Sequence, residues 1–248
     1  MKPFTSALLV AAFALSPARA DDAGAHAVLD KAIKALGGEE KLAKASALTW
    51  KAKGKITFND NTNEFTSHAT VRGLDHYRSE FEGEFNGNPI KGVTVLNGDK
   101  GWRKFGDNFM KLEGDMLENE KRSVYLQVIP TVLVPLKGKG FKVESAAEQN
   151  VDGKPAAALK ATGPDGKDFT IYFDKESGLP VKQVATVVGF GGEEYTQETT
   201  LAGYKEFDGI KKATKVESKR NGEKFVEIEI SEFSVPDKVD DDTFAEPQ

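Results

Sequence analysis

Apolar and polar residues alternate along much of the chain with the period of a β-strand. Between Leu48 and Phe58 the even positions hold apolar residues and one glycine, whereas the odd positions hold threonine and lysine. The same alternation recurs between Val226 and Ser231. This period predicts strands that bury one face and expose the other, as in an antiparallel sheet. Turn signals separate further predicted strands at 90–96, 100–105, 141–147, 156–162, 168–174, 179–188, 194–204, 211–218 and 224–233.

The hairpin around Gly73 has a register that the sequence predicts. A two-residue turn would place Tyr77 on the polar face of the hairpin. A three-residue loop at 73–75 instead pairs Val71 with Tyr77 and Ser67 with Phe81, which keeps the apolar side chains on one face. We therefore predict the three-residue loop.

Two segments have helical spacing instead. Apolar residues from Ala25 to Leu36 form one stripe, and Gly37 and Gly38 supply the left-handed residue that commonly ends a helix. The second segment, 115–136, is rich in apolar residues and is predicted to be a helix from about Asp115 to Ile129, interrupted at Pro130 and ending near Pro135. It either closes one end of the core or forms a mobile lid over an apolar cavity.

The N-terminus has the pattern of an export signal. Lys2 precedes an apolar run, and Ala18-Arg19-Ala20 has the small residues of a cleavage site. We predict cleavage after Ala20, so that residues 1–20 are a signal peptide and residues 21–248 form one β domain. No later window holds about 18 uncharged apolar residues, so no transmembrane anchor is expected in the mature chain. The protein is expected to be exported to the periplasm, with secretion as the alternative.

Composition removes several classes of function. The chain has no cysteine, which excludes disulfides, thiolate metal sites, a cysteine nucleophile and a lipidated N-terminal cysteine. Without Lys2 and Arg19, the chain has 32 basic and 39 acidic residues, a net charge of −7. Such a surface repels polyanions, so no nucleic-acid partner is expected.

The sequence has no recognisable catalytic, cofactor or metal motif. Nucleophile-elbow, zinc-protease and phosphate-loop patterns are absent. His68 and His76 are separated along the predicted sheet by roughly 13 Å, too far to bind one ion. The acidic run 237–242 lacks the alternation and the glycine of a calcium loop and is predicted to be a solvated tail. We predict a protein that is not an enzyme and has no cofactor or metal; an unrecognised hydrolase is the less favoured alternative.

Large apolar side chains gather on the predicted inner face of the sheet and on the 115–136 helix. Ordinary core packing is one explanation. The other is a partly open barrel whose inner side chains line a cavity for an apolar ligand. On that interpretation the candidate ligand-binding residues are Trp50, Phe58, Phe65, Tyr77, Phe81, Trp102, Tyr125, Ile129, Leu133 and Ile171.

Three stretches of the sequence have a familiar arrangement. They are Gly37-Gly38 followed by Ala47-Leu48-Thr49-Trp50, the strand–turn–strand at 172–181, and the segment 204–211, together with the closing Asp242-Thr243-Phe244. These stretches resemble the periplasmic lipoprotein-carrier-like superfamily, also called outer-membrane lipoprotein-sorting proteins. The resemblance implies a mainly antiparallel β fold with a few helices, a curved and incomplete barrel wrapped around or plugged by helices. It further implies that the 115–136 segment is the lid.

The resemblance also implies a function, because members of that superfamily bind lipid acyl chains or act as binding modules of the cell envelope. Our leading hypothesis is a non-enzymatic periplasmic binding protein for an apolar ligand, such as a lipid or lipoprotein acyl chain. The ligand would lie between a concave sheet and a helical lid. The alternative is a protein-interaction module with a filled core, whose partner is another protein of the cell envelope.

Overall fold

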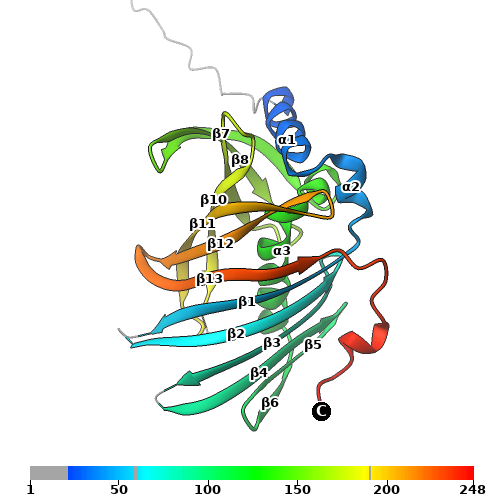
Figure 1. Cartoon of the computed structure of the whole chain (residues 1–248), viewed down its shortest axis with the longest axis vertical. Coiled ribbons are helices and arrows are strands. Elements are labelled where there is room, and N and C mark those ends of the chain that lie inside the picture. Colours follow the sequence, from blue (N-terminus) through cyan, green and yellow to red (C-terminus); the bar gives the residue numbers. More distant parts are fainter. Residues whose placement is uncertain (1–21, 59–60, 86, 190) are drawn as a thin grey trace, which may run out of the picture.

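The chain is built on one large antiparallel sheet (Figure 1). A computed structural model describes residues 22–58, 61–85, 87–189 and 191–248; the predicted signal peptide and its cleavage site lie outside these ranges. In the described residues, 13 strands pair in the order β6-β5-β4-β3-β2-β1-β13-β12-β11-β10-β9-β8-β7. The strands are β1 (Ala47–Phe58), β2 (Asn61–Arg72), β3 (His76–Phe85), β4 (Asn88–Asn97), β5 (Lys100–Phe105), β6 (Asn108–Leu112), β7 (Lys142–Val151), β8 (Lys154–Thr162), β9 (Asp168–Asp174), β10 (Pro180–Val188), β11 (Glu194–Phe207), β12 (Ile210–Arg220) and β13 (Glu223–Ser234). The predicted fold class is confirmed.

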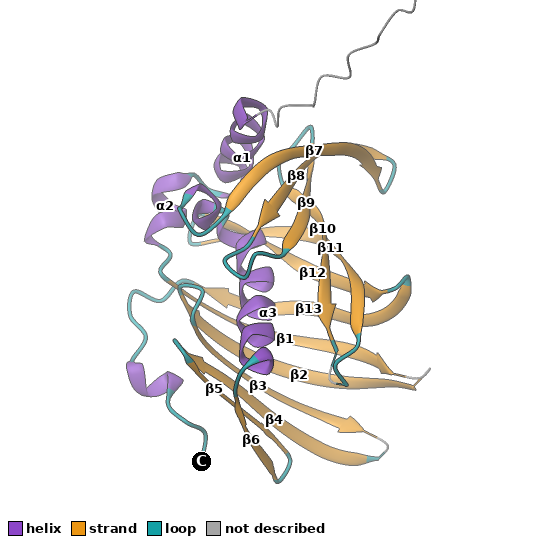
Figure 2. Cartoon of the chain, turned by 180° about the vertical axis from the view of Figure 1, so that it is seen from behind, coloured by secondary structure: helices purple, strands orange, loops and turns teal. Residues whose placement is uncertain are grey.

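The order of the strands explains where the long helix lies. The chain runs outward from β1 to the edge strand β6, and it returns from the opposite edge, β7, to β13, which pairs with β1. The segment between the two edges contains α3 (Asp115–Val132) and the short η1 (Val134–Lys137). A helix of 18 residues is about 27 Å long, so α3 carries the chain from one half of the sheet to the other. Figure 2 shows α3 crossing the concave face.

The sheet is curved, and several pairings contain irregularities that favour curvature. Register shifts occur at Lys51/Ala52, Ala146/Gln149, Pro180/Lys182 and Ser218/Lys219. An extra residue in one strand bends that strand and increases its twist. The sheet therefore wraps around α3 without its edge strands β6 and β7 pairing.

The predicted register of the β2–β3 hairpin is confirmed. Val71 lies opposite Tyr77 and Ser67 lies opposite Phe81. Directly opposite residues of antiparallel strands point to the same face, so this register also assigns side chains to the concave or the outer face. Leu48, opposite Val71, is buried with α3, which identifies their shared face as the concave one.

Helix α3 fills the middle of the concave face because two of its sides are apolar. Tyr125, Ile129 and Leu133 join a core with α1 (Asp22–Leu36), β8, β9 and β10. Val124 and Val128 join a second core with β1, β2 and β3. The helix therefore separates two packed interiors.

The predicted interruption of this helix at Pro130 is wrong. Pro130 lies inside α3, which continues to Val132 and ends where Leu133 adopts a left-handed φ of 53°. A proline in a helix removes one backbone hydrogen bond, yet burial on the surrounding sheet stabilises the turn that contains it. The sequence pattern placed the element correctly, but α3 passes Pro130 without interruption and ends at Val132, before the predicted end near Pro135.

Helix α1 begins and packs as its apolar stripe predicts. Leu29 and Leu36 are fully buried against the sheet. Gly37 ends the helix with a φ of 140°, and a β-carbon there would lie 2.4 Å from the carbonyl oxygen of Gly209. Only glycine therefore lets the chain turn into α2 (Glu39–Lys44) so close to the β11–β12 turn.

The four aspartates of the acidic C-terminal segment are exposed to solvent as the sequence predicts, but the segment itself is not a free tail. It forms η2 (Asp241–Phe244) and packs on the outer face of the sheet, where Phe244 is fully buried against Val95 and Trp102. Asp241 forms a 2.6 Å ion pair with Arg72. Because Trp102 lies under this segment, its predicted place on the inner face is also wrong.

Candidate ligand-binding surface

Phenylalanines line the part of the concave face that extends past α3. Gly54 of β1 lies opposite Phe65, and Phe65 lies opposite Gly83. One row nearer to α3, Phe81 lies opposite Gly92, which lies opposite Phe105. These rows share a face with the residues that pack against α3. We call the set Phe58, Phe65, Phe81, Phe85, Phe105 and Phe225 the aromatic floor.

The rings of the aromatic floor contact one another across strands. The centroids of Phe81 and Phe105 are 5.6 Å apart, and those of Phe81 and Phe85 are 6.5 Å apart. Phe58 and Phe225 meet edge to face at 5.5 Å. Such pairs stabilise a sheet surface beyond the burial of their area.

Glycines make room for the rings of the aromatic floor, because they have no side chain where the rings lie. A β-carbon at Gly92 would lie 2.0 Å from a ring carbon of Phe81, and one at Gly54 would lie 2.7 Å from the ring of Phe65. The two rings therefore lie over glycine backbone of the neighbouring strand instead of beside another side chain. A glycine covered by an aromatic ring also gains packing that it could not supply itself.

The aromatic floor exposes apolar area to solvent. Phe58 is 37% exposed and Phe105 is 42% exposed. Met110, opposite Arg103 on the same face, and Met116, in the first turn of α3, are 45% and 51% exposed. Monomeric proteins rarely expose apolar groups gathered in this way, and such patches commonly mark binding surfaces.

A partly buried ion pair borders the aromatic floor at the start of α3. Arg103, from the concave face of β5, binds Glu120 of α3. Burial raises the pKa of the Glu120 carboxyl, although the Arg103 guanidinium opposes the rise. Burial also raises the pKa of the neighbouring Tyr77 hydroxyl to about 12. This end of α3 is therefore fixed to the sheet by a charged contact as well as by packing.

Polar contacts also fix the middle of α3. Arg122, only 3% exposed, forms a 3.1 Å ion pair with Asp165 in the β8–β9 turn. Its Nε donates to the carbonyl oxygen of Thr186 at 3.0 Å, and Tyr125 donates to Asp165 at 2.9 Å. The pKa of the Tyr125 hydroxyl is raised, and burial is the largest cause.

A lysine contacts the last turn of α3. Lys212 of β12 donates to the hydroxyl of Thr131 at 2.6 Å. Its Nζ lies 5.7 Å from the ring centroid of Trp50 and 6.0 Å from that of Phe233. Burial lowers the pKa of the Lys212 ammonium to about 8. Helix α3 is thus held at its start, middle and end.

The structure separates the sequence-predicted ligand-binding residues into four places. Tyr125, Ile129, Leu133 and Ile171 belong to the first core and are at most 3% exposed. Tyr77 is buried in the second core, with Trp50 packed against it. Trp102 lies on the outer face. Phe58, Phe65 and Phe81 lie together on the aromatic floor.

Sequence reasoning missed three members of the aromatic floor. Phe85 continues the alternation of Phe81, so its face could have been predicted. Phe105 depended on the register of β5, and Phe225 lies beside a register shift, so the alternation alone did not place either one. The glycines opposite the rings were a further signal, because glycine within a strand marks close approach of another group.

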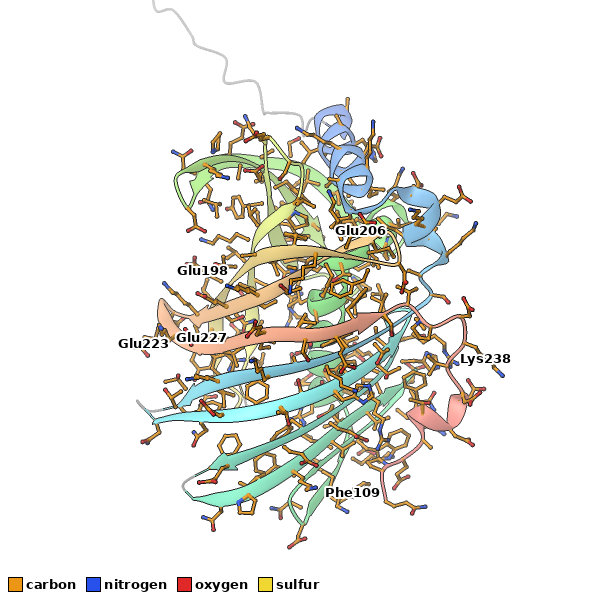
Figure 3. The ribbon with its side chains drawn as sticks, viewed as in Figure 1. Phe109, Glu198, Glu206, Glu223, Glu227 and Lys238 are labelled. Carbon is orange, nitrogen blue, oxygen red and sulfur yellow. The ribbon has the colours of Figure 1, made fainter. Side chains whose placement is uncertain are left out.

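The outer face has a hollow of a different character. It has a volume of about 810 Å³ and lies over β1, β2, β12 and β13. Its walls are mostly charged side chains that pair with each other, such as Lys53 with Glu229 at 3.5 Å and Lys55 with Glu64 at 3.2 Å. Glu227, labelled in Figure 3, belongs to the same wall.

The fold agrees with that of two solved structures. A DUF1329 family protein from Desulfovibrio piger has 15% sequence identity and a TM-score of 0.57, with 89% of this chain and 97% of that chain covered. A LolA superfamily protein from Nitrosomonas europaea has 10% identity and a TM-score of 0.59, with 90% and 97% covered. The chain has a LolA-like fold. No protein-family model and no curated protein sequence matches it.

Two kinds of feature were not found in the described part of this LolA-like fold. No described helix is long and apolar enough to cross a membrane. Nor do the described histidine, aspartate and glutamate side chains form a group of three or more that could hold a metal ion. The aromatic floor gathers partly exposed apolar side chains on the concave face of this LolA-like fold.

Proposed function

We propose that the protein is a non-enzymatic binding protein of the cell envelope that holds the apolar part of a lipid or of a lipoprotein acyl chain. The observation that carries the proposal is the aromatic floor, whose partly exposed rings line the concave face beside α3. Burial of each methylene group supplies about 0.8 kcal/mol. No bond needs to be made or broken for such a protein to work.

The proposal moves the ligand from beneath α3 to the surface beside it. Val124 and Ile129 are fully buried on opposite sides of the helix, so its interfaces with the sheet are filled. A ligand beneath α3 would have to displace this packing and the contacts of Glu120, Arg122 and Thr131. A ligand on the aromatic floor displaces only water.

The LolA-like fold and the predicted signal peptide support an envelope role. Members of the superfamily that the sequence resembles bind acyl chains or act as envelope binding modules. The pattern of residues 1–20 supports export, with the periplasm as the proposed compartment. We propose residues 21–248 as the mature binding domain.

A pair of substitutions tests where the ligand binds. Phe105→Glu should weaken binding of a fluorescent fatty acid about tenfold or more, because a carboxylate would replace a ring of the aromatic floor. Phe109→Glu is the matched control: Phe109 lies on the adjacent strand, is 48% exposed and faces outward, opposite Lys104. Its substitution should leave binding unchanged.

Native mass spectrometry of protein purified from an envelope fraction should show bound lipid. Absence of lipid, together with failure of the wild-type protein to bind the fluorescent probe, would contradict the proposal. Equal loss of binding in both variants would place the ligand elsewhere.

A second candidate is a protein-interaction module of the envelope. The filled interfaces of α3 favour it, because a protein that binds only through its surface needs no cavity. The charged hollow of about 810 Å³ on the outer face would be its docking surface. Cross-linking in cells that captures one reproducible envelope protein, and is lost on charge reversal at Lys53 and Lys55, would support this candidate.

A further inference from the structure

The concave face changes chemistry beyond β13. On β10, β11 and β12 several polar side chains point inward among apolar ones, whereas the aromatic floor is apolar. Gln183 lies opposite Ile171, a core residue, and also opposite Thr199, which lies opposite Ser218. Gln197 lies opposite Arg220 in the adjacent row. We call Gln183, Gln197, Thr199, Ser218 and Arg220 the polar wall.

A hydrogen-bond donor of the polar wall is unused. Gln183 is 5% exposed, and its Nε2 has no hydrogen-bond partner in the described structure. A buried polar group without a partner costs about 1–3 kcal/mol. Native proteins leave few such groups, and each one calls for an explanation such as strain, a catalytic role, an ordered water or a bound ion. Gln183 therefore indicates a missing acceptor on the concave side.

Arg220 adds a positive charge to the same wall. Its guanidinium lies 3.5 Å from the ring centroid of Phe225 and 5.3 Å from that of Tyr195. Its Nε donates to Gln197 at 3.1 Å, and none of the ion pairs between described side chains includes it. Burial lowers the pKa of the Arg220 guanidinium, although Tyr195 and Glu193 oppose the change.

The polar wall and the aromatic floor adjoin. Phe225 contacts the Arg220 guanidinium on one side and the ring of Phe58 on the other. Ser218 lies opposite Val226, and Val226 lies opposite Ile56 of β1, so this row of the concave face leads from the polar wall to the aromatic floor. The apolar surface of the aromatic floor is therefore continuous with the hydrogen-bond donors of the polar wall.

We propose that the polar wall binds the anionic head group of an amphiphile whose apolar chain lies on the aromatic floor. This inference rests on the proposed function and specifies its ligand. Arg220 would supply the charge, and Gln183 would donate its unused N–H. A carboxylate and a phosphate share the chemistry that such a wall recognises, because arginine binds both with paired donors.

Competition with three ligands of equal chain length tests the head-group preference. Dodecanoate, dodecyl phosphate and dodecanol would each displace the neutral probe N-phenyl-1-naphthylamine from the wild-type protein at neutral pH. We expect one or both anions to displace it at about tenfold lower concentration than dodecanol. The ratio between the two anions distinguishes a carboxylate from a phosphate head group. Equal potency of all three ligands would overturn the inference and leave the proposed function intact.

Variants assign the preference to the polar wall. Arg220→Gln should remove most of the preference for anions and leave displacement by dodecanol unchanged, whereas Arg220→Lys should retain part of it. Lys215→Gln, on the exposed outer face of the same strand, is the matched control and should behave as wild type. Gln183→Leu should weaken anion binding several-fold. An unchanged preference in Arg220→Gln would refute the assignment, and failure of the wild-type protein to bind any of the four compounds would refute the proposed function as well.

Discussion

Replacement of Asp165 with alanine should lower the free energy of unfolding by about 3–5 kcal/mol, because it leaves the Arg122 guanidinium charged and buried without its partner. Asp165 also accepts the hydroxyl of Tyr125, so two polar groups of α3 lose their acceptor in one substitution. Urea denaturation followed by circular dichroism measures the change as a lower midpoint with a similar slope.

The control for this prediction is another arginine–aspartate pair of the same chain. Asp241 pairs with Arg72 at 2.6 Å, but its side chain is 87% exposed. Asp241→Ala should therefore cost no more than about 1 kcal/mol. A loss below about 1 kcal/mol in Asp165→Ala would mean that the contact in the middle of α3 does not hold the helix.

Replacement of Lys212 with methionine should increase the free energy of unfolding at pH 7 by about 1–3 kcal/mol. Burial lowers the pKa of this ammonium from 10.5 to about 8, so the charged form is disfavoured in the folded protein. Methionine keeps most of the length of the side chain and removes the charge. The lost hydrogen bond to Thr131 reduces the gain.

The same substitution has a pH signature. Below about pH 8 Lys212 is charged in both the folded and the unfolded chain, and between about pH 8 and 10.5 the unfolded chain binds the extra proton. Stability of the wild-type protein relative to Lys212→Met should therefore rise with pH across that window. Urea denaturation of both proteins at pH 7, 8, 9 and 10 measures the difference. A difference that stays constant over this range would show that Lys212 is not desolvated in the folded state.

The sequence predicted which side chains of β1, β2 and β3 face inward because one face of each strand is apolar and the other is polar and exposed to solvent. That rule fails where both faces are covered. Trp102 on β5 is buried on the outer face by Phe244, and Gly101 and Phe105 face inward, so the largest apolar side chain of the strand indicates the wrong side. The face on which Trp102 is buried depends on where the C-terminal segment packs. The local sequence pattern of β5 does not contain that information.

The candidate site could be predicted only in part for a related reason. Alternation identified Phe58, Phe65 and Phe81, but it could not tell a ring that is sealed under α3 from one that lies beyond it. That distinction depends on the path of α3, which the order of strands sets. The ion pair of Arg122 with Asp165 joins residues 43 apart in sequence, and the charge pattern of neither segment indicates it.

The pairing of β1 with β13 at the centre of the sheet has a consequence for biogenesis. All other neighbouring strands are also neighbours in sequence, so each half of the sheet can form from local hairpins. The seam between the halves joins Trp50 to Phe233 and cannot close until nearly the whole chain is available. Until then β1 has a free edge, which is prone to pair with other chains. We therefore expect a chain of this design to depend on protection from aggregation until its last strand is available.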